Sequence, residues 1–495
     1  MSKKQNEVLL FLFLFPNLFF GQGLNNLWLL GYECCSPNFQ PVTINFYNNS
    51  WSLTNSNRTM NFCETSAIIS DSLGSLLFYT NGTYICNSSD DTMINGAGLS
   101  PCDFSTSHSY HGLTIPQGAL VIPMPGNSSQ YYLFHNSSDD RFNTYAAYFL
   151  YYSIIDMSLD SGMGVVSQKN VILKNDTLVA GRLTSCKHAN GRDWWLICHE
   201  YDSPIYFKYL ITPTGIQGPW SQSIGSVRQN YYGQCKFNNS GTKFAYYEPL
   251  MSDLDIFDFD RCTGLFSNAI NIPIHDSAVG GGLAFAPGDR YLYVSSDSFI
   301  YQFDTQAPII GQSKTTVGTY NGGSTLGFST NFYMSELAAD GKIYINCLNS
   351  TLDLHVINSP DSAGSSCGFC QQCIHLPGLN AYTIPNYPNY FLGADSSSIC
   401  DSLNTGIDPK WSTQTSELLL FPNPVKSLFY ISTPKDLDIA EVEISNSLGQ
   451  SISAPFFRIS NGEYIQCDAS QLSPGVYFVS IRSKKLIQVK KFIKE

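Results

Sequence analysis

The sequence predicts an all-β protein: a seven-bladed β-propeller, with a six-bladed ring as the alternative, followed by a small Ig-like antiparallel β-sandwich. Three features of the chain lead to this prediction. A strand–turn–strand pattern recurs through most of the chain, aromatic residues make up 14% of the 495 residues, and there are 38 Gly and 24 Pro. Aromatic side chains favour pleated strands, and Gly and Pro favour the tight turns that join them.

The composition argues against two broad classes of protein. Apolar residues are 43% and charged residues 13% of the chain, whereas disordered chains combine low hydrophobicity with high charge. The 27 basic residues are outnumbered by 39 acidic ones, which gives a net charge of −12. Nucleic acid is therefore not an expected partner, because its binding needs a basic surface. We also expect no cofactor.

The N-terminus reads as a signal peptide over residues 1–23. It has a basic start at Lys3 and Lys4, a mostly apolar run at residues 8–20, and small residues at Gly21 and Gly23. This order is typical of a cleaved export signal. A retained membrane anchor is the alternative, but the apolar run is shorter than the roughly 20 residues that a span needs. We expect no transmembrane segment in the mature chain.

The cysteines fit export. There are 15 of them, and Cys467 stands apart in the last segment while the others fall between Cys34 and Cys400. The even number left in that region permits complete pairing, and oxidising compartments favour disulfides. The sequence does not say which Cys pairs with which.

One pattern recurs six times: an apolar strand, a turn with Gly, and a second strand rich in Tyr, Phe, Leu and Ile. The turn glycines are Gly74, Gly126, Gly191, Gly241, Gly288 and Gly341, at intervals of 52, 65, 50, 47 and 53 residues. In the fourth unit, strands are expected at residues 233–238, 243–247, 254–259 and 265–272. Four antiparallel strands in about 40–50 residues are typical of a propeller blade.

A seventh blade can be assembled from the two ends of the repeat region. The fifth unit has strands at residues 282–286, 291–295 and 299–303, with its last strand expected near Ile309. The seventh would combine outer strands at residues 26–30, 42–46 and 51–54 with an innermost strand at residues 387–392. Closing the ring in this way leaves no open sheet edge. We expect the propeller to span residues 24–400.

This region resembles the exported propellers of Bacteroidetes-type bacteria. The runs that carry the resemblance are CETSAIISDSLGSLLFYTNGTYICN, YSIIDMSLDSGMG, KHANGRDWWLICHE and IFDFDRCTGLFSN. The resemblance implies a fold and an export route rather than a ligand.

A second module follows a Ser-, Asp- and Thr-rich linker at residues 401–416. Residues 417–495 are expected to hold strands at 428–432, 441–445, 451–453, 464–467 and 476–482. Strands of this kind predict a small antiparallel sandwich.

The second module resembles the type A sorting domain of the type IX secretion system. Four motifs match in order: LLLFPNPVKSLFYI, VEISNSLGQSI, LSPGVYFVSI and VKKFIK. The motif positions of the family fall on Pro422, Asn423, Pro424, Gly449, Gly475, Val476, Tyr477 and Phe478. The resemblance implies passage through the periplasm and handling by the type IX secretion machinery and a sortase-like peptidase, so that the protein ends secreted or on the outer cell surface. An accessory sandwich that binds sugar or stiffens a stalk is the alternative.

Two clusters could hold metal ions. Cys367, Cys370 and Cys373, with His375, could form a zinc set, but for an exported chain we favour a disulfide-stapled loop and no metal. Asp253, Asp255, Asp258 and Asp260 lack the glycine that a calcium loop of the EF-hand kind needs. Strand alternation instead predicts a solvated strand face, with Asp260 starting a turn. His108 and His111 alone do not make a metal site.

Four charged residues fall on or beside the expected innermost strands: Glu64, Lys187, Lys236 and Glu336. Glu64 and Glu336 are the catalytic candidates, because two carboxylates about 5–10 Å apart would suit glycoside hydrolysis. Polar groups that merely line a wet channel are the alternative. Trp194 and Trp195 should point to opposite faces of one strand, so that one is in the core and the other could be exposed and stack on a sugar, or equally cover a neighbouring blade. His188 is expected to stabilise the turn that follows it.

Three functions remain open. We expect a non-catalytic surface propeller that presents a binding face to a glycan or a protein. A secreted hydrolase of polysaccharide or peptide, with its site at the channel mouth, is the first alternative, and a structural component of the cell surface is the second. An aromatic patch on one face of the ring would favour binding, and convergent acids would favour hydrolysis.

Overall fold

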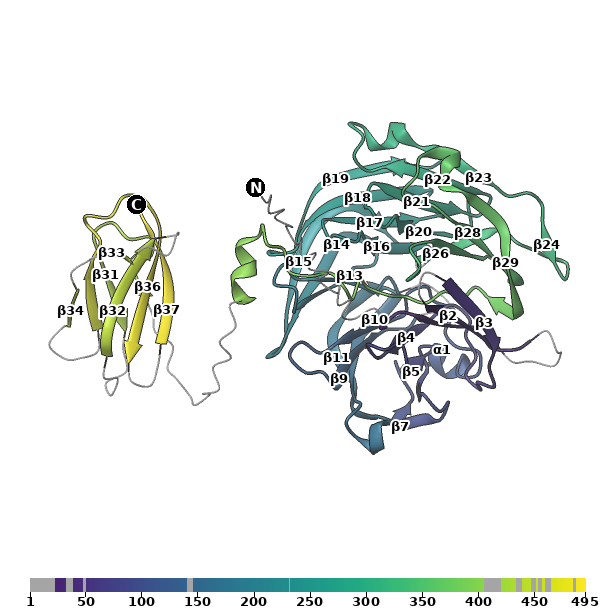
Figure 1. The fold of residues 1–495 in the computed structure, drawn as a ribbon, viewed down its shortest axis with the longest axis horizontal. Helices are drawn as coiled ribbons and strands as arrows, with labels where there is room; N and C mark the ends of the chain where they lie inside the picture. Colours follow the sequence, from purple (N-terminus) through teal and green to yellow (C-terminus); the bar gives the residue numbers. More distant parts are fainter. Residues whose placement is uncertain are drawn as a thin grey trace, which may run out of the picture. The chain divides into compact units, whose positions relative to one another are not determined.

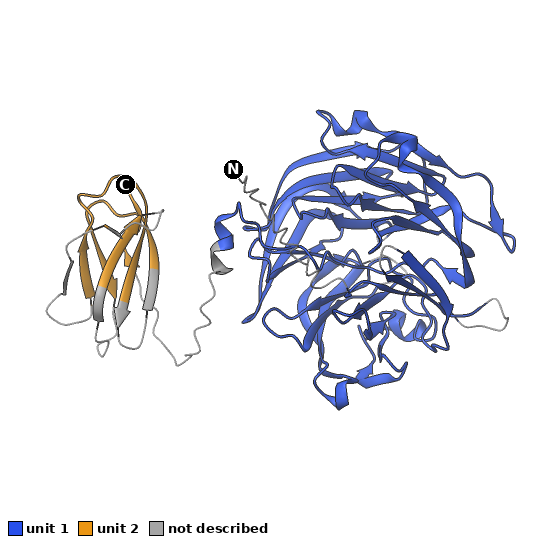
Figure 2. Ribbon diagram, viewed as in Figure 1, with its two compact units in different colours: residues 1–405 blue, residues 406–495 orange. Residues whose placement is uncertain are grey.

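The computed structural model describes residues 23–32, 39–47, 50–139, 146–230, 232–404, 420–432, 439–446, 451–452, 456–458, 464–483 and 487–495. The chain divides into two compact units, residues 1–405 and residues 406–495 (Figure 2). Nearly all of the expected signal peptide and most of the expected linker lie outside the described residues.

Unit 1 is built of antiparallel sheets, which confirms the all-β prediction and gives a propeller-like fold (Figure 1). Six groups of four strands follow one another along the chain. Their strands are β4 (Ala67–Ser70), β5 (Leu76–Thr80), β6 (Tyr84–Asn87) and β7 (Thr92–Ala97); β8 (Ala119–Pro123), β9 (Gln130–His135), β10 (Ala146–Asp156) and β11 (Val165–Val179); β12 (Thr184–Lys187), β13 (Trp194–His199), β14 (Ser203–Thr212) and β15 (Gly215–Arg228); β16 (Gln234–Phe237), β17 (Lys243–Glu248), β18 (Asp253–Asp260) and β19 (Leu265–Pro273); β20 (Gly281–Phe285), β21 (Tyr291–Ser296), β22 (Phe299–Asp304) and β23 (Thr315–Thr319); β26 (Phe332–Leu337), β27 (Ile343–Cys347), β28 (Ser350–Ile357) and β29 (Phe369–Ala381). A single parallel bridge between Ile94 and Val165 joins the first two groups into one eight-stranded sheet.

Short elements connect these sheets. They are α1 (Asp103–Ser107), η1 (Asp160–Gly162), η2 (Ile310–Ser313), η3 (Gly364–Cys367), η4 (Ile399–Asn404) and the hairpin β24 (Ser324–Thr325) and β25 (Phe328–Ser329). The last strand of the fifth group is β23, at Thr315–Thr319, so the prediction of a strand near Ile309 is wrong. Ile309 instead precedes the 3-10 turn η2, where Ile310 is buried against the core. An apolar residue there marks a core contact rather than a strand.

A further sheet has three strands: β1 (Leu27–Leu30), β2 (Val42–Tyr47) and β3 (Ser50–Asn55). It lies between the first and sixth groups, because β1 contacts β4 while β2 and β3 contact β29. The strand expected at residues 387–392 does not form. Pro385 and Pro388 have no N–H to give to a ladder, which opposes a strand in the middle of a sheet.

The first strand of each group lies innermost, and we call β1, β4, β8, β12, β16, β20 and β26 the inner strands. Contacts run from β1 to β4 and on to β8, and from β12 through β16 and β20 to β26. The recurring glycines close the turns that follow these strands. At Gly241 the backbone has φ +70°, and an added Cβ would lie 2.5 Å from Sγ of Cys186, so only glycine fits that turn without strain.

Two disulfides join described cysteines, Cys262 to Cys400 and Cys370 to Cys373. The possibility of complete pairing is not realised. Free thiols remain at Cys63, Cys86, Cys102, Cys186, Cys198, Cys235, Cys347, Cys367 and Cys467. Most of them are buried, where a thiol packs as a small apolar side chain. Cys34 and Cys35 lie outside the described residues.

The described residues of unit 2 form two four-stranded antiparallel sheets. One contains β30 (Leu420–Phe421), β31 (Leu428–Ser432), β35 (Tyr464–Asp468) and β34 (Phe456–Arg458), and the other contains β33 (Ser451–Ile452), β32 (Ile439–Asn446), β36 (Gly475–Ser483) and β37 (Ile487–Lys494). Both sheets contribute to one core; Phe429 comes from the first, and Tyr477 and Phe492 come from the second. All five predicted strands form, and the sequence missed β30, β34 and β37.

Candidate functional site

The middle of unit 1 is filled by the chain itself. After β29 ends, residues 382–395, which we call the central segment, pass between the groups of sheets (Figure 1). Residues 383–388 are all buried. At one end of the passage, Oγ1 of Thr383 donates to the carbonyl of Cys63 at 2.6 Å. The central segment is therefore part of the core.

Asn386 connects the central segment to several inner strands at once. Its backbone N–H donates to the carbonyl of Ser66 at 3.0 Å. Its Nδ2 donates to the carbonyls of Ala119 and Leu183 at 3.1 and 2.9 Å. Its Oδ1 accepts a hydrogen bond from Nε2 of Gln117 at 3.1 Å. A single buried side chain thus bonds to groups that lie in or directly before β8 and β12, as buried polar atoms require.

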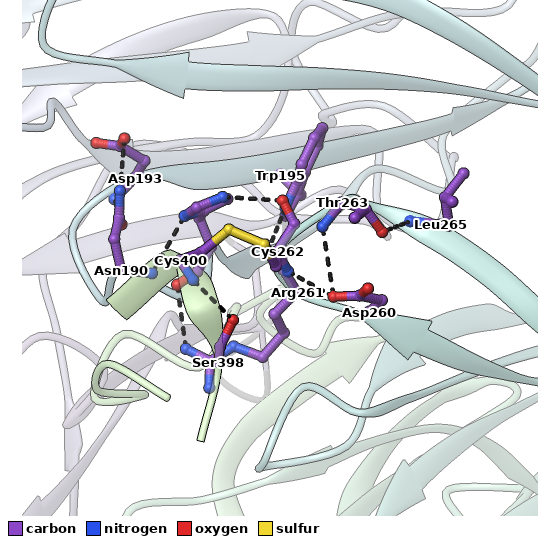
Figure 3. The surroundings of a disulfide bond; sticks show 11 residues. Asn190, Asp193, Trp195, Asp260, Arg261, Cys262, Thr263, Leu265, Ser398 and Cys400 are labelled. Atoms are coloured by element: carbon purple, nitrogen blue, oxygen red, sulfur yellow. Dashed lines mark hydrogen bonds between the residues drawn. A yellow bond between two sulfur atoms is a disulfide. The ribbon is translucent and has the colours of Figure 1, made fainter. Parts of the chain in front are cut away.

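The exit of the central segment is held by the turn between β18 and β19. Nη2 of Arg261 donates to the carbonyl of Gly393 at 2.5 Å, and the next residue, Cys262, is bonded to Cys400. Figure 3 shows this disulfide beside Trp195, whose Nε1 donates to the carbonyl of Arg261 at 2.8 Å. Asp260 starts the turn, as predicted, and its Oδ1 accepts from the N–H of Cys262.

A cleft of about 370 Å³ opens beside the central segment. Its walls come from the ends of β16, β20 and β26, from the residues before β1, from the end of β2, and from the central segment. The lining residues are Asn25, Asn26, Phe46, Tyr47, Lys236, Phe237, Asn239, Ala284, Phe285, Pro287, Glu336, Leu337, Ala338, Ala339, Asp340, Gly341, Tyr387, Pro388, Asn389 and Phe391. Tyr47 is 67% exposed and Phe391 is 43% exposed, so two aromatic rings stand at the rim.

An ion pair lies in the wall of this cleft. Nζ of Lys236 is 2.5 Å from Oε2 of Glu336 and also donates to the carbonyl of Tyr387 at 3.2 Å and to Oδ1 of Asn386 at 3.4 Å. Both charged side chains are buried. Burial raises the pKa of Glu336 to about 7, although Lys236 lowers it. All three N–H donors of the Lys236 ammonium group therefore have partners within the protein. The carboxyl of Glu336 changes charge near neutral pH.

Glu64 does not join this cleft. It is buried, and its Oε1 accepts a hydrogen bond from the hydroxyl of Tyr333 at 2.8 Å, near the start of β26. Glu336 lies three residues further along that strand, about 10 Å at the usual rise. Burial raises the pKa of Glu64 to about 7, while the bond from Tyr333 lowers it. Glu64 and Glu336, which the sequence suggested as a catalytic pair, therefore lie near opposite ends of β26.

Two of the other predicted positions lie in the core. Trp194 and Trp195 are both buried, so the prediction that one of them could be exposed is wrong. Both faces of β13 are covered, and strand alternation then leaves neither ring free. Lys187 lies over the ring of Trp194 at 5.1 Å, and burial lowers its pKa. His188 stabilises its turn as predicted, because its Nδ1 accepts from the N–H of Asn190 at 3.1 Å.

The cysteine cluster at residues 367–373 contains a disulfide bond. Cys370 and Cys373 form the predicted disulfide, but it lies within strand β29 of the sixth group and not in a loop after that group, so their sulfurs are not available as thiolate ligands. Cys367 is buried, and His375 pairs with Asp353 at 3.1 Å. The alternative of a four-residue zinc set is therefore wrong.

The aspartates of β18 do not form one solvated face. Asp255 is buried and pairs with Nη2 of Arg228 at 2.6 Å, while Asp253 pairs with Nη1 at 2.5 Å. Asp258 pairs with Lys243 at 2.6 Å. The prediction failed at Asp255 because Arg228, at the end of β15, reaches across from the neighbouring sheet. Among the described residues, no group of three or more His, Cys, Asp or Glu is placed to hold a metal ion.

Sequence reasoning missed Asn386 and the rim of the cleft. Asn386 stands in the run Pro385–Asn–Tyr–Pro388, and the two prolines were a signal against a strand. Tyr47, Asp340 and Phe391 are far apart in sequence, and nothing local marks them as neighbours.

Comparison with protein families identifies the end of the chain. Residues 419–495 match the family described as the secretion system C-terminal sorting domain. A tail of this kind marks proteins that type IX secretion exports, so this protein is secreted or lies on the outer cell surface. No helix in the described part of the chain has the length and hydropathy that crossing a membrane requires. No curated protein matches the sequence.

Solved structures similar to unit 1 are distant. A protein from Bacteroides uniformis, provisionally assigned as a 6-phosphogluconolactonase, is 11% identical with a TM-score of 0.46, over 72% of this chain and 98% of its own. One from Bacteroides fragilis with the same provisional assignment is 11% identical, with a TM-score of 0.43, over 73% and 97%. The periplasmic gluconolactonase of Pseudomonas aeruginosa is 12% identical, with a TM-score of 0.40, over 72% and 98%. None reaches a TM-score of 0.5, and function is therefore argued from this chain's own residues.

Proposed function

We propose that this protein is an exported surface propeller that binds a carbohydrate in the cleft and does not turn it over. Residues 24–400 would form a closed ring of seven blades, with the sheet β1–β3 as the seventh. The contacts of β1 with β4, and of β2 and β3 with β29, support this closure. Unit 2 would be an Ig-like sandwich, and the chain would come from a Bacteroidetes-type bacterium.

The export route would use both ends of the chain. Residues 1–23 would be a signal peptide, and residues 417–495, after the linker 401–416, would be read by the secretion machinery and removed by a sortase-like peptidase. Asn423 supports a role for the first motif, because its side chain accepts from the N–H of Ile493 at 2.9 Å and so holds this turn to β37. Tyr477 of the GVYF motif stacks on Phe492 in the core. Pro422, Pro424, Gly475, Val476 and Phe478 complete the described motif positions, and Gly449 lies outside the described residues.

The observation that carries the proposed function is the chemistry of the cleft. Its volume falls within the range of ligand pockets, about 300–1,000 Å³. Two exposed rings, Tyr47 and Phe391, line the cleft together with polar and apolar side chains. Aromatic faces combined with amide and carboxyl oxygens suit a sugar, which has an apolar ring face and a hydroxyl periphery. The central segment fills the space beside the cleft, so the ligand would be held at one face.

Hydrolysis is the second candidate function, because Glu336 lines the cleft with a pKa raised to about 7 by burial. A glycoside hydrolase needs a second carboxylate as nucleophile or base. Asp340 is the other carboxyl in the lining. Its Oδ1 accepts from the N–H of Lys342, and its Oδ2 accepts from the hydroxyl of Tyr344 at 2.7 Å. A carboxylate fixed in this way is poorly placed to attack, which favours binding over turnover.

Binding can be tested on a glycan array and then by calorimetry with the best ligand. Phe391→Ala should weaken binding about fivefold or more, because losing one stacked ring costs about 1 kcal/mol or more. Phe328→Ala is the matched control, since Phe328 is 49% exposed on β25 and does not line the cleft. Equal losses in both variants, or no glycan bound by the wild type, would contradict the proposal.

Turnover is tested in parallel with oligosaccharide and peptide substrates. The proposal expects no product from the wild type. Product formation that is abolished by Glu336→Gln would show that the cleft is an active site, and the hydrolase would replace the binding protein.

A further inference from the structure

We infer that the sugar bound in the cleft carries a positively charged amino group, so that the ligand is an amino-sugar glycan. This inference rests on the proposed function and adds the chemical class of the ligand. It comes from the polar atoms of the cleft, from its charges and from its aromatic rim.

The polar atom left open in the cleft is an acceptor. The one bond of Glu336 in the described part of the chain goes to its Oε2, so Oε1 stays open on a side chain that lines the cleft. A ligand that satisfies this atom must bring a hydrogen-bond donor.

Three side-chain donors of the cleft already have partners within the protein. Nζ of Lys236 bonds to three acceptors. Nδ2 of Asn239 donates to the carbonyl of Pro287 at 2.8 Å, and Nδ2 of Asn389 donates to the carbonyl of Asn239 at 2.8 Å. A peptide backbone brings as many acceptors as donors, so its carbonyls would find few partners here. An ammonium group, which only donates hydrogen bonds, fits this set better than a peptide does.

The charges point in the same direction. The charged side chains in the lining are one cation, Lys236, and two carboxyls, Glu336 and Asp340. An ionised Glu336 therefore leaves the cleft with a surplus of negative charge. An ammonium group brought next to Oε1 would balance it and gain a charge-assisted hydrogen bond. The rings of Tyr47 and Phe391 at the rim offer faces that also attract a cation.

Binding of a cation should release a proton from the cleft. The groups that interact electrostatically with Glu336 are Lys236 on β16 and Tyr387 and Tyr390 on the central segment. Asp340, on the turn after β26, is the other carboxyl that lines the cleft. The pKa of Glu336 is raised to about 7 by burial. A neighbouring ammonium group lowers that pKa, so at pH 6.5 the carboxyl loses its proton when the ligand enters. A neutral sugar has no such effect.

The test compares glucosamine oligosaccharides with N-acetylglucosamine oligosaccharides of equal length by calorimetry at pH 6.5. The glucosamine series should bind about tenfold or more tightly, as expected for a charge-assisted bond. Repeating the titration in two buffers of different ionisation enthalpy should show proton release for the glucosamine series only. A lysine oligopeptide of equal charge should bind more weakly than the glucosamine series.

Three variants keep the test decisive. Glu336→Gln should reduce the preference for glucosamine to about threefold or less, and Asp340→Asn should reduce it partly; the second variant serves if the first fails to fold. Glu64→Gln, a matched control that also removes a buried carboxyl next to β26, should leave the preference unchanged. Equal binding of both sugar series would overturn the inference while the proposed function stands. Tighter binding of the peptide would overturn both.

Discussion

Two carboxyls in the middle of unit 1, Glu64 and Glu336, share many properties but differ in access. Both are buried, both lie next to β26, and burial raises the pKa of each to about 7. Glu336 pairs with Lys236 and lines the cleft, whereas Glu64 accepts a hydrogen bond from Tyr333 and does not line it.

The comparison shows that a perturbed pKa alone does not identify a functional carboxyl. Desolvation gives the same shift in a packed interior as at the wall of a binding site. What distinguishes Glu336 is its place in the lining of the cleft and its ion pair with Lys236. In a fold of this kind, a functional site should therefore be located first by its cleft and only then by the perturbed pKa values of the residues that line it.

The largest expected effect is at Asn386 of the central segment. Asn386→Ala removes the partners of Gln117, Ala119 and Leu183, and each buried group left unpaired costs about 1–3 kcal/mol. We expect the free energy of unfolding to fall by about 4 kcal/mol, measured by urea unfolding with the fluorescence of the buried Trp28 and Trp194 as the probe. Asn389→Ala, a neighbour that is only half-buried, should cost less than about 1.5 kcal/mol. Equal effects would mean that the central segment is a surface strap and not part of the core.

The next largest effect is expected at Lys236, which pairs with Glu336 but not with Glu64. Lys236→Met leaves the carboxylate of Glu336 buried without a partner, and breaking a buried ion pair costs about 3–5 kcal/mol. The pKa of Glu336 then rises further, so the variant is most stable at low pH and loses stability as pH rises through that pKa. We expect a loss of about 3 kcal/mol at pH 8 and clearly less at pH 5. Lys243→Met, which breaks the half-exposed pair with Asp258, should cost less than about 1 kcal/mol at either pH.

The repeats and the middle of the unit differ in how far the sequence predicts them. The fourth group matches its predicted strands closely, because its alternating strands and turn glycines are local signals. The middle is different. Residues 387–392 have the aromatic composition of a strand, but Pro388 removes a ladder donor, and Tyr390 bonds to the carbonyl of Val121 far away in sequence. Long-range partners decide that conformation.

The site was predicted only in part for the same reason. Glu336 and Lys236 could be placed on inner strands from the repeat pattern, and they do meet. Their position in a cleft depends on Tyr47 and Phe391, which come from opposite ends of unit 1. Burial of Trp195 and Asp255 also depends on neighbouring sheets, and alternation along one strand does not show it.

A smaller effect is expected at Glu64. Its pKa of about 4.5 in the unfolded chain becomes about 7 in the folded one, so the folded protein holds a proton more tightly. The stability that this group contributes is full below pH 4.5 and is lost as pH rises through 7, by about 3 kcal/mol at most. Glu64→Gln cannot ionise, and its amide oxygen can still accept from Tyr333. The variant should therefore match the wild type at pH 5 and be about 2–3 kcal/mol more stable at pH 8.

The measurement is urea unfolding at pH 5, 6, 7 and 8. Glu336→Gln is the comparison variant, and it should gain less at pH 8 because it leaves Lys236 without its carboxylate. Parallel pH profiles for wild type and Glu64→Gln would mean that Glu64 ionises as freely in the folded protein as in the unfolded chain, and the comparison of the two carboxyls would fail.

The smallest effect on stability is expected at the rim. Tyr47 is 67% exposed, so Tyr47→Ala should change the free energy of unfolding by less than about 0.5 kcal/mol, as is usual for surface substitutions. Tyr110→Ala is the control, because Tyr110 is 65% exposed and does not line the cleft. Both variants should unfold like the wild type, and only Tyr47→Ala should weaken binding of the glycan. A large loss of stability at Tyr47 would place its ring in the core, and the cleft would then lose the aromatic wall that distinguishes Glu336 from Glu64.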